Sequence, residues 1–161
     1  MAVIPIRTYP DPVLRQKSKR VRNIDSSIQK LIGDMIETMN SAAGVGLAAP
    51  QIGVPLRVIV IGMPGEETIV LINPQVVRRK GERLISEACL SIPGYFGEVK
   101  RAESVTVKGR DPQGKEIRIK ADELLAQALE HEIDHLNGTL YIDRLESKDK
   151  LYKIEPEEVQ L

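Results

Sequence analysis

The chain has 161 residues, with 23 basic and 23 acidic side chains and a hydrophobic content of 42%. This length and composition predict one domain, residues 1–161, with one hydrophobic core. Because the formal charge is zero and aromatic residues make up 3%, we expect neither specific nucleic-acid binding nor membrane association. The N-terminus has no secretory signal pattern, and the one cysteine, Cys89, has no partner for an internal disulfide. These features predict a cytoplasmic protein.

The first strong element along the chain is a helix from Asp25 to about Asn40, with Asp25 or Ser26 as its N-cap. A basic run, "LRQKSKRVR" at 14–22, precedes the helix and is more typical of a solvated surface than of a site for ribosomal RNA. Apolar residues at helical spacing should pack this helix on the core: Ile24, Ile28, Leu31, Ile32, Met35, Ile36 and Met39.

The middle of the chain predicts antiparallel sheet. Short apolar runs at 57–62, 68–73 and 75–77 favour strands, and the alternating segment 104–120 favours a hairpin around its D-P-Q-G turn. Helical periodicity returns from Ala121 to Gly138. The predicted fold class is therefore α+β, with antiparallel sheets packed around this late helix and a further N-terminal helix.

The late helix contains "HEIDH" at 131–135, with the only two histidines of the chain. His131 and His135 lie one turn apart on one face, so both imidazoles can reach a single metal ion. Glu132 lies one position round the helix and suits the general-base role that this motif assigns to it. Asp134 points elsewhere, and we interpret it as a surface or salt-bridging residue.

A catalytic site of this type needs a third protein ligand. Cys89 is the favoured candidate, because a thiolate binds zinc or ferrous iron well and "SEACLSIPG" is more typical of a shaped loop than of a core strand. Asp143 and Glu146 just beyond the helix remain alternatives, as in peptidases with two histidines and a glutamate.

The segment "GVGLAAPQ" at 44–51 has no acid or base. It predicts either a tight loop or an extended edge that binds a peptide through main-chain hydrogen bonds. In the second interpretation, the amide of Gln51 donates a hydrogen bond toward a polarised carbonyl.

Taken together, three segments resemble the signature motifs of peptide deformylases: G44-V-G-L-A-A-P-Q51, E87-A-C-L-S91 and H131-E-I-D-H135. The resemblance extends from "DPVLR" near the start to "YIDRL" after the metal helix. It implies a metallohydrolase that removes the formyl group from the N-terminal methionine of nascent polypeptides and releases formate. N-formyl-methionyl peptides are the implied partners, together with a transient ribosome contact.

The resemblance also implies roles for individual residues. Glu132 would move the proton, while Gln51 and the backbone N–H of Leu90 would face the developing oxyanion. One divalent ion is implied, Fe2+ in the cell, with Zn2+, Ni2+ or Co2+ in purified protein. The implied metal ligands are Cys89, His131 and His135. The implied substrate-binding residues are Val45, Gly46, Leu124 and Ala128.

Two positions depart from the pattern of the family. Ala88 replaces a glycine, for which we expect a modest adjustment of the ligand loop. Phe96 occupies the loop "PGYFGE", where some members carry an arginine, so Tyr95 or main-chain groups would take over that contact. Three rival functions remain: a metallopeptidase acting on unformylated peptides, a noncatalytic metal-stabilised module and a hydrolase with Cys89 as nucleophile.

Overall fold

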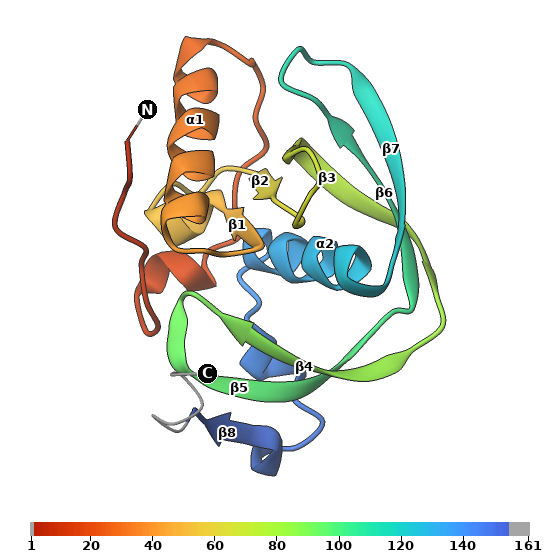
Figure 1. Ribbon diagram of the computed structural model, residues 1–161. Coiled ribbons are helices and arrows are strands. Elements are labelled where there is room, and N and C mark those ends of the chain that lie inside the picture. Colours follow the sequence, from red (N-terminus) through yellow and green to blue (C-terminus); the bar gives the residue numbers. More distant parts are fainter. Residues whose placement is uncertain (1, 155–161) are drawn as a thin grey trace.

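The computed structural model describes residues 2–154 and contains two antiparallel sheets arranged around a central helix (Figure 1). The five-stranded sheet has the order β1-β2-β3-β6-β7, and the three-stranded sheet has the order β4-β5-β8. The larger sheet comprises β1 (Gly46–Ala48), β2 (Val58–Ile61), β3 (Ile69–Lys80), β6 (Ser104–Arg110) and β7 (Glu116–Asp122). The smaller sheet comprises β4 (Arg83–Cys89), β5 (Ile92–Arg101) and β8 (Leu151–Lys153).

The first long helix, α1 (Ser26–Ser41), begins where the sequence predicts. The carboxylate of Asp25 accepts hydrogen bonds from the backbone N–H groups of Ser27 and Ile28, as expected for an N-cap. Its apolar stripe packs against β1 and β2. Within the described part of the chain, four short 3-10 helices lie in the connections: η1 (Pro12–Arg15), η2 (Ala49–Ile52), η3 (Tyr141–Arg144) and η4 (Lys148–Lys150).

Helix α2 (Glu123–Leu136) follows directly from β7 and lies in the middle of the molecule (Figure 1). Its apolar residues join the inner face of the larger sheet in one hydrophobic cluster. Gly138, in the left-handed conformation with φ of 74°, follows the end of the helix, which agrees with the predicted stop. The predicted α+β class, with antiparallel sheets around the motif-bearing helix, is confirmed.

The strand predictions were partly wrong. The segments 68–73 and 75–77 form one strand, β3, and its register against β6 shifts between Ile72 and Gln75, at Pro74. Proline has no N–H to donate, so the ladder becomes irregular there without ending. The expected loop around Cys89 is also incorrect, because Cys89 is the last residue of β4 and pairs with Ile92 across a tight turn.

No helix formed by residues 2–154 has the length and apolar character needed to cross a membrane.

Candidate metal centre

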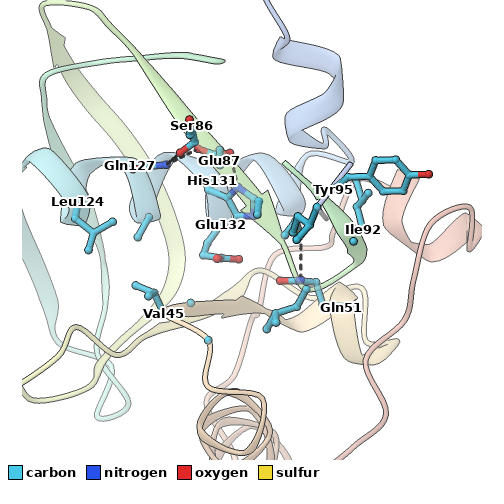
Figure 2. Close-up of a pocket in the computed structure, with 18 residues that line it drawn as sticks. Val45, Gln51, Ser86, Glu87, Ile92, Tyr95, Leu124, Gln127, His131 and Glu132 are labelled. Carbon is cyan, nitrogen blue, oxygen red and sulfur yellow. Dashed lines mark hydrogen bonds and ion pairs between the residues drawn. The ribbon is translucent and has the colours of Figure 1, made fainter. Parts of the chain in front are cut away.

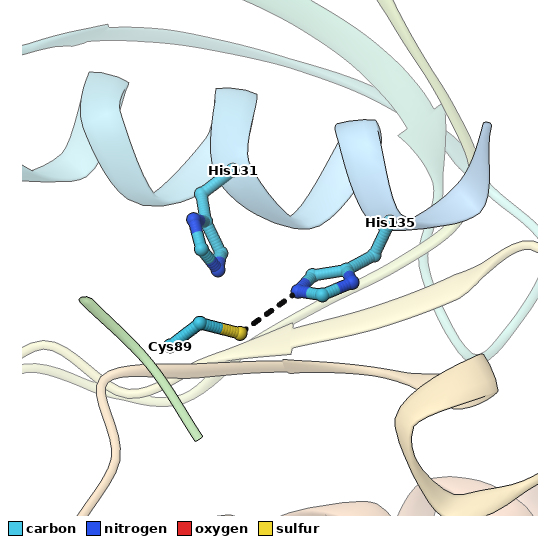
Figure 3. A group of neighbouring side chains, drawn as sticks. All are labelled: Cys89, His131 and His135. Atoms are coloured by element: carbon cyan, nitrogen blue, oxygen red, sulfur yellow. Dashed lines mark hydrogen bonds between the residues drawn. The ribbon is translucent and has the colours of Figure 1, made fainter. Parts of the chain in front are cut away.

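The two histidines of α2 point into the space between the helix and the end of β4, where Cys89 meets them (Figure 3). The Cys89 Sγ lies 3.3 Å from His135 Nε2. One ligand atom from each of Cys89, His131 and His135 lies within 4.8 Å of the others. The structure therefore brings together the three residues that the sequence analysis named as metal ligands.

This group has the chemistry and spacing of a three-ligand metal site. Metal bonds of about 2.0–2.3 Å to nitrogen and sulfur place neighbouring tetrahedral ligands about 3.5 Å apart, close to the observed separation of Cys89 and His135. Asp143 is not part of the group, because its carboxylate pairs with the Arg15 guanidinium and accepts a hydrogen bond from the Leu140 N–H. Within residues 2–154 the group has three members, so a tetrahedral metal held by them would keep its fourth position for solvent or substrate.

Glu87 orients His131 from behind, and the sequence analysis assigned it no role. The His131 Nδ1 donates to Glu87 Oε2 at 2.5 Å, which leaves Nε2 free for a metal. Burial alone would raise the pKa of Glu87, but hydrogen bonds from His131 and Arg101 lower it to about 2. The sequence did contain a signal for this role. Glu87 is a carboxylate two residues before the candidate ligand Cys89, and metal-binding histidines commonly donate a hydrogen bond to a carboxylate.

The Glu87 carboxylate belongs to a buried ion-pair network. Arg101, which is 3% exposed, donates to Glu87 at 2.6 Å and to Asp134 at 2.8 Å. Asp134 also pairs with Arg144. Asp134 is therefore a salt-bridging residue, which was one of the two interpretations from the sequence. It is not a surface residue, because it is buried.

The sulfur of Cys89 faces hydrogen-bond donors. The Ser91 N–H lies 3.4 Å from it, and Gln51 Nε2 lies 3.7 Å from it. The orientation of the Gln51 amide is fixed, since its oxygen accepts from Ala48 N–H and its nitrogen donates to Ser91 Oγ. Both donors can hydrogen-bond to a sulfur that serves as a metal ligand.

Glu132 lies on the cavity side of the helix. One of its oxygens, Oε1, is buried without a hydrogen-bond partner among the described residues. The other approaches Gly46 so closely that a Cβ atom at that position would lie 2.6 Å from it. Burial raises the pKa of Glu132 to about 7, against the opposing influence of His131. A carboxyl group with such a pKa can both accept and release a proton near neutral pH.

A cavity of about 330 Å³ opens beside these groups (Figure 2). Cys89, His131 and Glu132 line it, whereas His135 lies behind them and is 1% exposed. Leu124 lines it and is 45% exposed, so its side chain offers apolar surface to a ligand in the cavity. The remaining residues that the sequence analysis named also line this cavity: Val45, Gly46, Gln51, Leu90 and Ala128.

The two departures from the family pattern have different surroundings. Ala88 lines the cavity and is not among the residues of positive φ, so its backbone does not require glycine. The expected loop around Phe96 is part of strand β5. Tyr95 lines the cavity, while the ring of Phe96 packs against Tyr152 with centroids 5.2 Å apart.

The fold and the centre are typical of one class of protein: α+β metallohydrolases in which an H-E-x-x-H helix offers two metal ligands and a cysteine offers the third. Comparison with known proteins identifies the family within this class. Residues 3–151 match the sequence model of the polypeptide deformylase family. The chain belongs to the peptide deformylase family, whose members are metal-dependent enzymes that remove the N-formyl group from nascent polypeptides.

Individual relatives agree over almost the whole chain. The peptide deformylase of Dehalococcoides mccartyi strain CBDB1 is 58% identical over 159 residues, which cover 98% of this chain and 95% of that relative. The peptide deformylase structure from Legionella pneumophila has a TM-score of 0.88 and 49% identity, covering 91% of this chain and 88% of that one. A structure from Synechococcus elongatus, solved in complex with actinonin, has a TM-score of 0.87 and 44% identity, covering 90% and 80%.

Proposed function

We propose that this chain hydrolyses the formyl amide of N-formyl-methionyl peptides at the centre formed by Cys89, His131 and His135. The observation that carries the proposal is the approach of these three ligand atoms to within 4.8 Å beside a cavity that Glu132 also lines. A divalent metal held there would supply Lewis acidity and lower the pKa of bound water strongly, toward about 7. The other contributions come from the protein.

The substrate peptide binds along the exposed edge of β1. That strand pairs with β2 on one side only, and Val45 and Gly46 at its start line the cavity. An extended peptide can add to such an edge through main-chain hydrogen bonds. The methionine side chain then occupies the apolar part of the cavity, between Val45, Leu124 and Ala128.

Glu132 handles the proton. Its pKa of about 7 leaves a substantial fraction ionised at neutral pH, ready to accept a proton from the attacking water. The same carboxyl group then donates that proton to the departing amine. Gln51 Nε2 and the Leu90 N–H stabilise the oxyanion that develops on the formyl carbon. Each such donor lowers the activation barrier by on the order of 3 kcal/mol.

A formate-release assay with the variant Glu132→Gln tests this proposal. We expect a loss of at least 10²-fold in kcat, because the general base is removed, with metal content unchanged from wild type. Glu123→Gln is a matched control on the same helix, exposed and outside the cavity lining, and should keep full activity. Turnover by Glu132→Gln at the wild-type rate would refute the assigned mechanism.

The rival functions give different results in parallel assays. A peptidase would cleave the same peptide without its formyl group, and a hydrolase with Cys89 as nucleophile would remain active after chelation of the metal. A purely structural metal would bind with four protein ligands. The open fourth position and the unpartnered oxygen of Glu132 support catalysis instead.

The remaining assignments belong to the same proposal. Two imidazoles and a thiolate suit Fe2+ in the cell, and Zn2+, Ni2+ or Co2+ can replace it in purified protein. We also propose that residues 1–161 act as one domain in the cytoplasm, in transient contact with the ribosome. Actinonin, which is bound in the Synechococcus elongatus structure, should occupy the same cavity here and raise the Tm.

A further inference from the structure

The outer face of β3, β6 and β7 is strongly basic, although the whole chain has no net formal charge. The inner face of these strands carries Val105, Val107 and Ala121, which pack against α2. Alternate residues point the other way, and most of these outward positions are polar or charged, the apolar exceptions on β3 being Ile72, which packs in the cluster of α1, and the exposed Val77. Six of them are basic and form what we call the basic face: Arg78, Lys80, Lys108, Arg110, Arg118 and Lys120.

The charges of the basic face are only partly offset by acidic neighbours. Two acidic residues occupy outward positions on the same strands, Glu116 opposite Arg110 and Asp122 opposite Ser104. Among the described residues, no member of the basic face forms an ion pair. Moreover, Lys108 and Arg118 are directly opposite each other across the β6–β7 ladder. Like charges in that position are destabilising, so the fold carries a cost that a bound anion would remove.

The basic face continues at both ends into a hollow. At one end, Arg78, Lys80 and Lys120 line a depression over the start of β6, with Asp122 as its one acidic residue. At the other end, Arg110 lines a second depression together with Arg20 and Arg22 from the segment before α1, with Asp25 as its one acidic residue. The seven residues of β6 connect the two, a distance of about 20 Å at roughly 3.3 Å per residue. The result is a continuous basic track on the side of the sheet away from α2.

We propose that the basic face binds the phosphate backbone of double-stranded RNA. A long track of unpaired cations fits a polyanion, and the lack of aromatic residues among its outward positions excludes recognition by base stacking. Membrane binding is disfavoured, because the exposed apolar side chain on that face, Val77, does not make the apolar surface that insertion among lipids needs. The Thr106 and Ser104 hydroxyls lie among the cations, where they can form hydrogen bonds with the 2′-hydroxyls that distinguish RNA from DNA.

This surface also suits the proposed function, on which the choice of RNA partly rests. A nascent polypeptide emerges from the ribosome, whose surface is largely RNA, and weak backbone binding would keep the enzyme near its substrate. Such binding is independent of nucleotide sequence, so it does not conflict with the expected lack of specific nucleic-acid recognition. A net charge of zero reports only the sum of the charges, so it does not exclude a local basic surface of this kind.

Fluorescence anisotropy with a labelled RNA duplex of about 20 base pairs tests the proposal, in salt from about 50 to 200 mM. Wild-type protein should bind, with an affinity that falls steeply as salt rises. The double variant Lys108→Glu/Arg118→Glu should bind at least tenfold more weakly and show a smaller salt slope. Its formate release should equal that of wild type, because neither residue lines the catalytic cavity.

A matched control reverses two charges elsewhere. Lys148→Glu/Lys153→Glu changes the net charge equally, at exposed positions in η4 and β8, and should bind RNA within twofold of wild type. Equal losses in both double variants, or no binding by wild type at the lowest salt, would overturn the proposal. Stronger binding to a DNA duplex of the same sequence, or to phosphatidylserine vesicles, would overturn it as well.

The single variant Lys108→Glu provides a second test that does not depend on activity. It places opposite charges across the ladder from Arg118, so we expect the Tm to rise by about 1–3 °C while RNA binding weakens. A lower Tm would show that the repulsion between Lys108 and Arg118 is not a cost to the fold, and would remove that part of the argument.

Discussion

Two buried carboxylates border His131 from opposite sides, and their surroundings give them opposite properties. Glu87 also borders the cavity, but its carboxylate lies on the network side, where Arg101 and His131 neutralise it and its pKa is about 2. Glu132 lies on the cavity side, where Oε1 has no partner among the described residues and burial raises its pKa to about 7. The same functional group is therefore fixed as an anion on one side and remains able to exchange protons on the other.

The largest expected effect follows from removing the charge on the network side. Glu87→Gln leaves the buried guanidinium of Arg101 without one of its two carboxylate partners, which should lower the free energy of unfolding by about 3 kcal/mol. Metal affinity should fall about 10- to 100-fold, because His131 loses its orienting acceptor. Urea denaturation of the metal-free protein and a metal titration measure the two effects.

A matched control for Glu87→Gln is Glu82→Gln. Glu82 pairs with Lys100 at the surface, at 3.5 Å, and is 62% exposed. Exposed ion pairs contribute no more than about 1 kcal/mol, so this variant should be close to wild type in both measurements. Equal stability of the two variants would contradict the structural importance assigned to the network side.

On the cavity side, a Glu→Gln substitution should raise the free energy of unfolding instead of lowering it. The pKa of Glu132 is raised in the folded state, so the native protein binds an extra proton between pH 4.5 and about 7 and loses stability as pH rises through that window. The shift corresponds to about 3 kcal/mol, which Glu132→Gln should recover in metal-free protein at pH 8. Denaturation at pH 5 and pH 8 tests this, because the gain should largely disappear at pH 5.

The pH dependence of Glu87 has the reverse direction. Its pKa is lowered from 4.5 to about 2, so its contribution is fully present above pH 4.5 and is lost as pH falls through 2. The free energy of unfolding of metal-free wild type should therefore fall more steeply below pH 4.5 than that of Glu87→Gln. Parallel slopes for the two proteins in that range would contradict the depressed pKa.

Gly46→Ala should disturb the cavity side without changing any charge. The new Cβ would lie 2.6 Å from Glu132 Oε2, so the carboxylate must move. Displacement of a catalytic group by about 1 Å can cost 10²-fold, which is the loss expected in kcat/KM for the formyl peptide. Gly62→Ala is the control, since its Cβ would meet the flexible end of Met39, 2.8 Å away and outside the cavity lining. Equal activities would show that Glu132 tolerates the added methyl group.

The difference between the two sides also explains what the sequence could predict. The groups along α2 follow from helical spacing, so a five-residue motif was enough to place His131, Glu132 and His135 relative to one another. Glu87 and Arg101 lie on β4 and β5, and they reach α2 only through tertiary packing. No local pattern in the sequence records that approach.

The smaller sheet was missed for a related reason. Strand β5 contains Pro93, Gly94 and Gly97, which argue against a strand in a local reading. Its pairing with β8 joins segments more than fifty residues apart, Tyr95 with Lys153 for example. At Gly97, a Cβ atom would lie 2.4 Å from the side chain of Leu145, so the glycine allows close packing that is visible only in the fold.

The smallest expected effect lies far from both carboxylates, at the start of α1. Asp25→Ala removes the acceptor for the N–H groups of Ser27 and Ile28, and should lower the Tm by about 2–4 °C. Asp25→Asn keeps a good N-cap and should change the Tm much less, which separates hydrogen bonding from charge. Formate release should be unchanged in both variants, because α1 contributes no residue to the cavity lining. An altered kcat in Asp25→Ala would mean that the stability of α1 is coupled to the catalytic centre through β1, which packs against both helices.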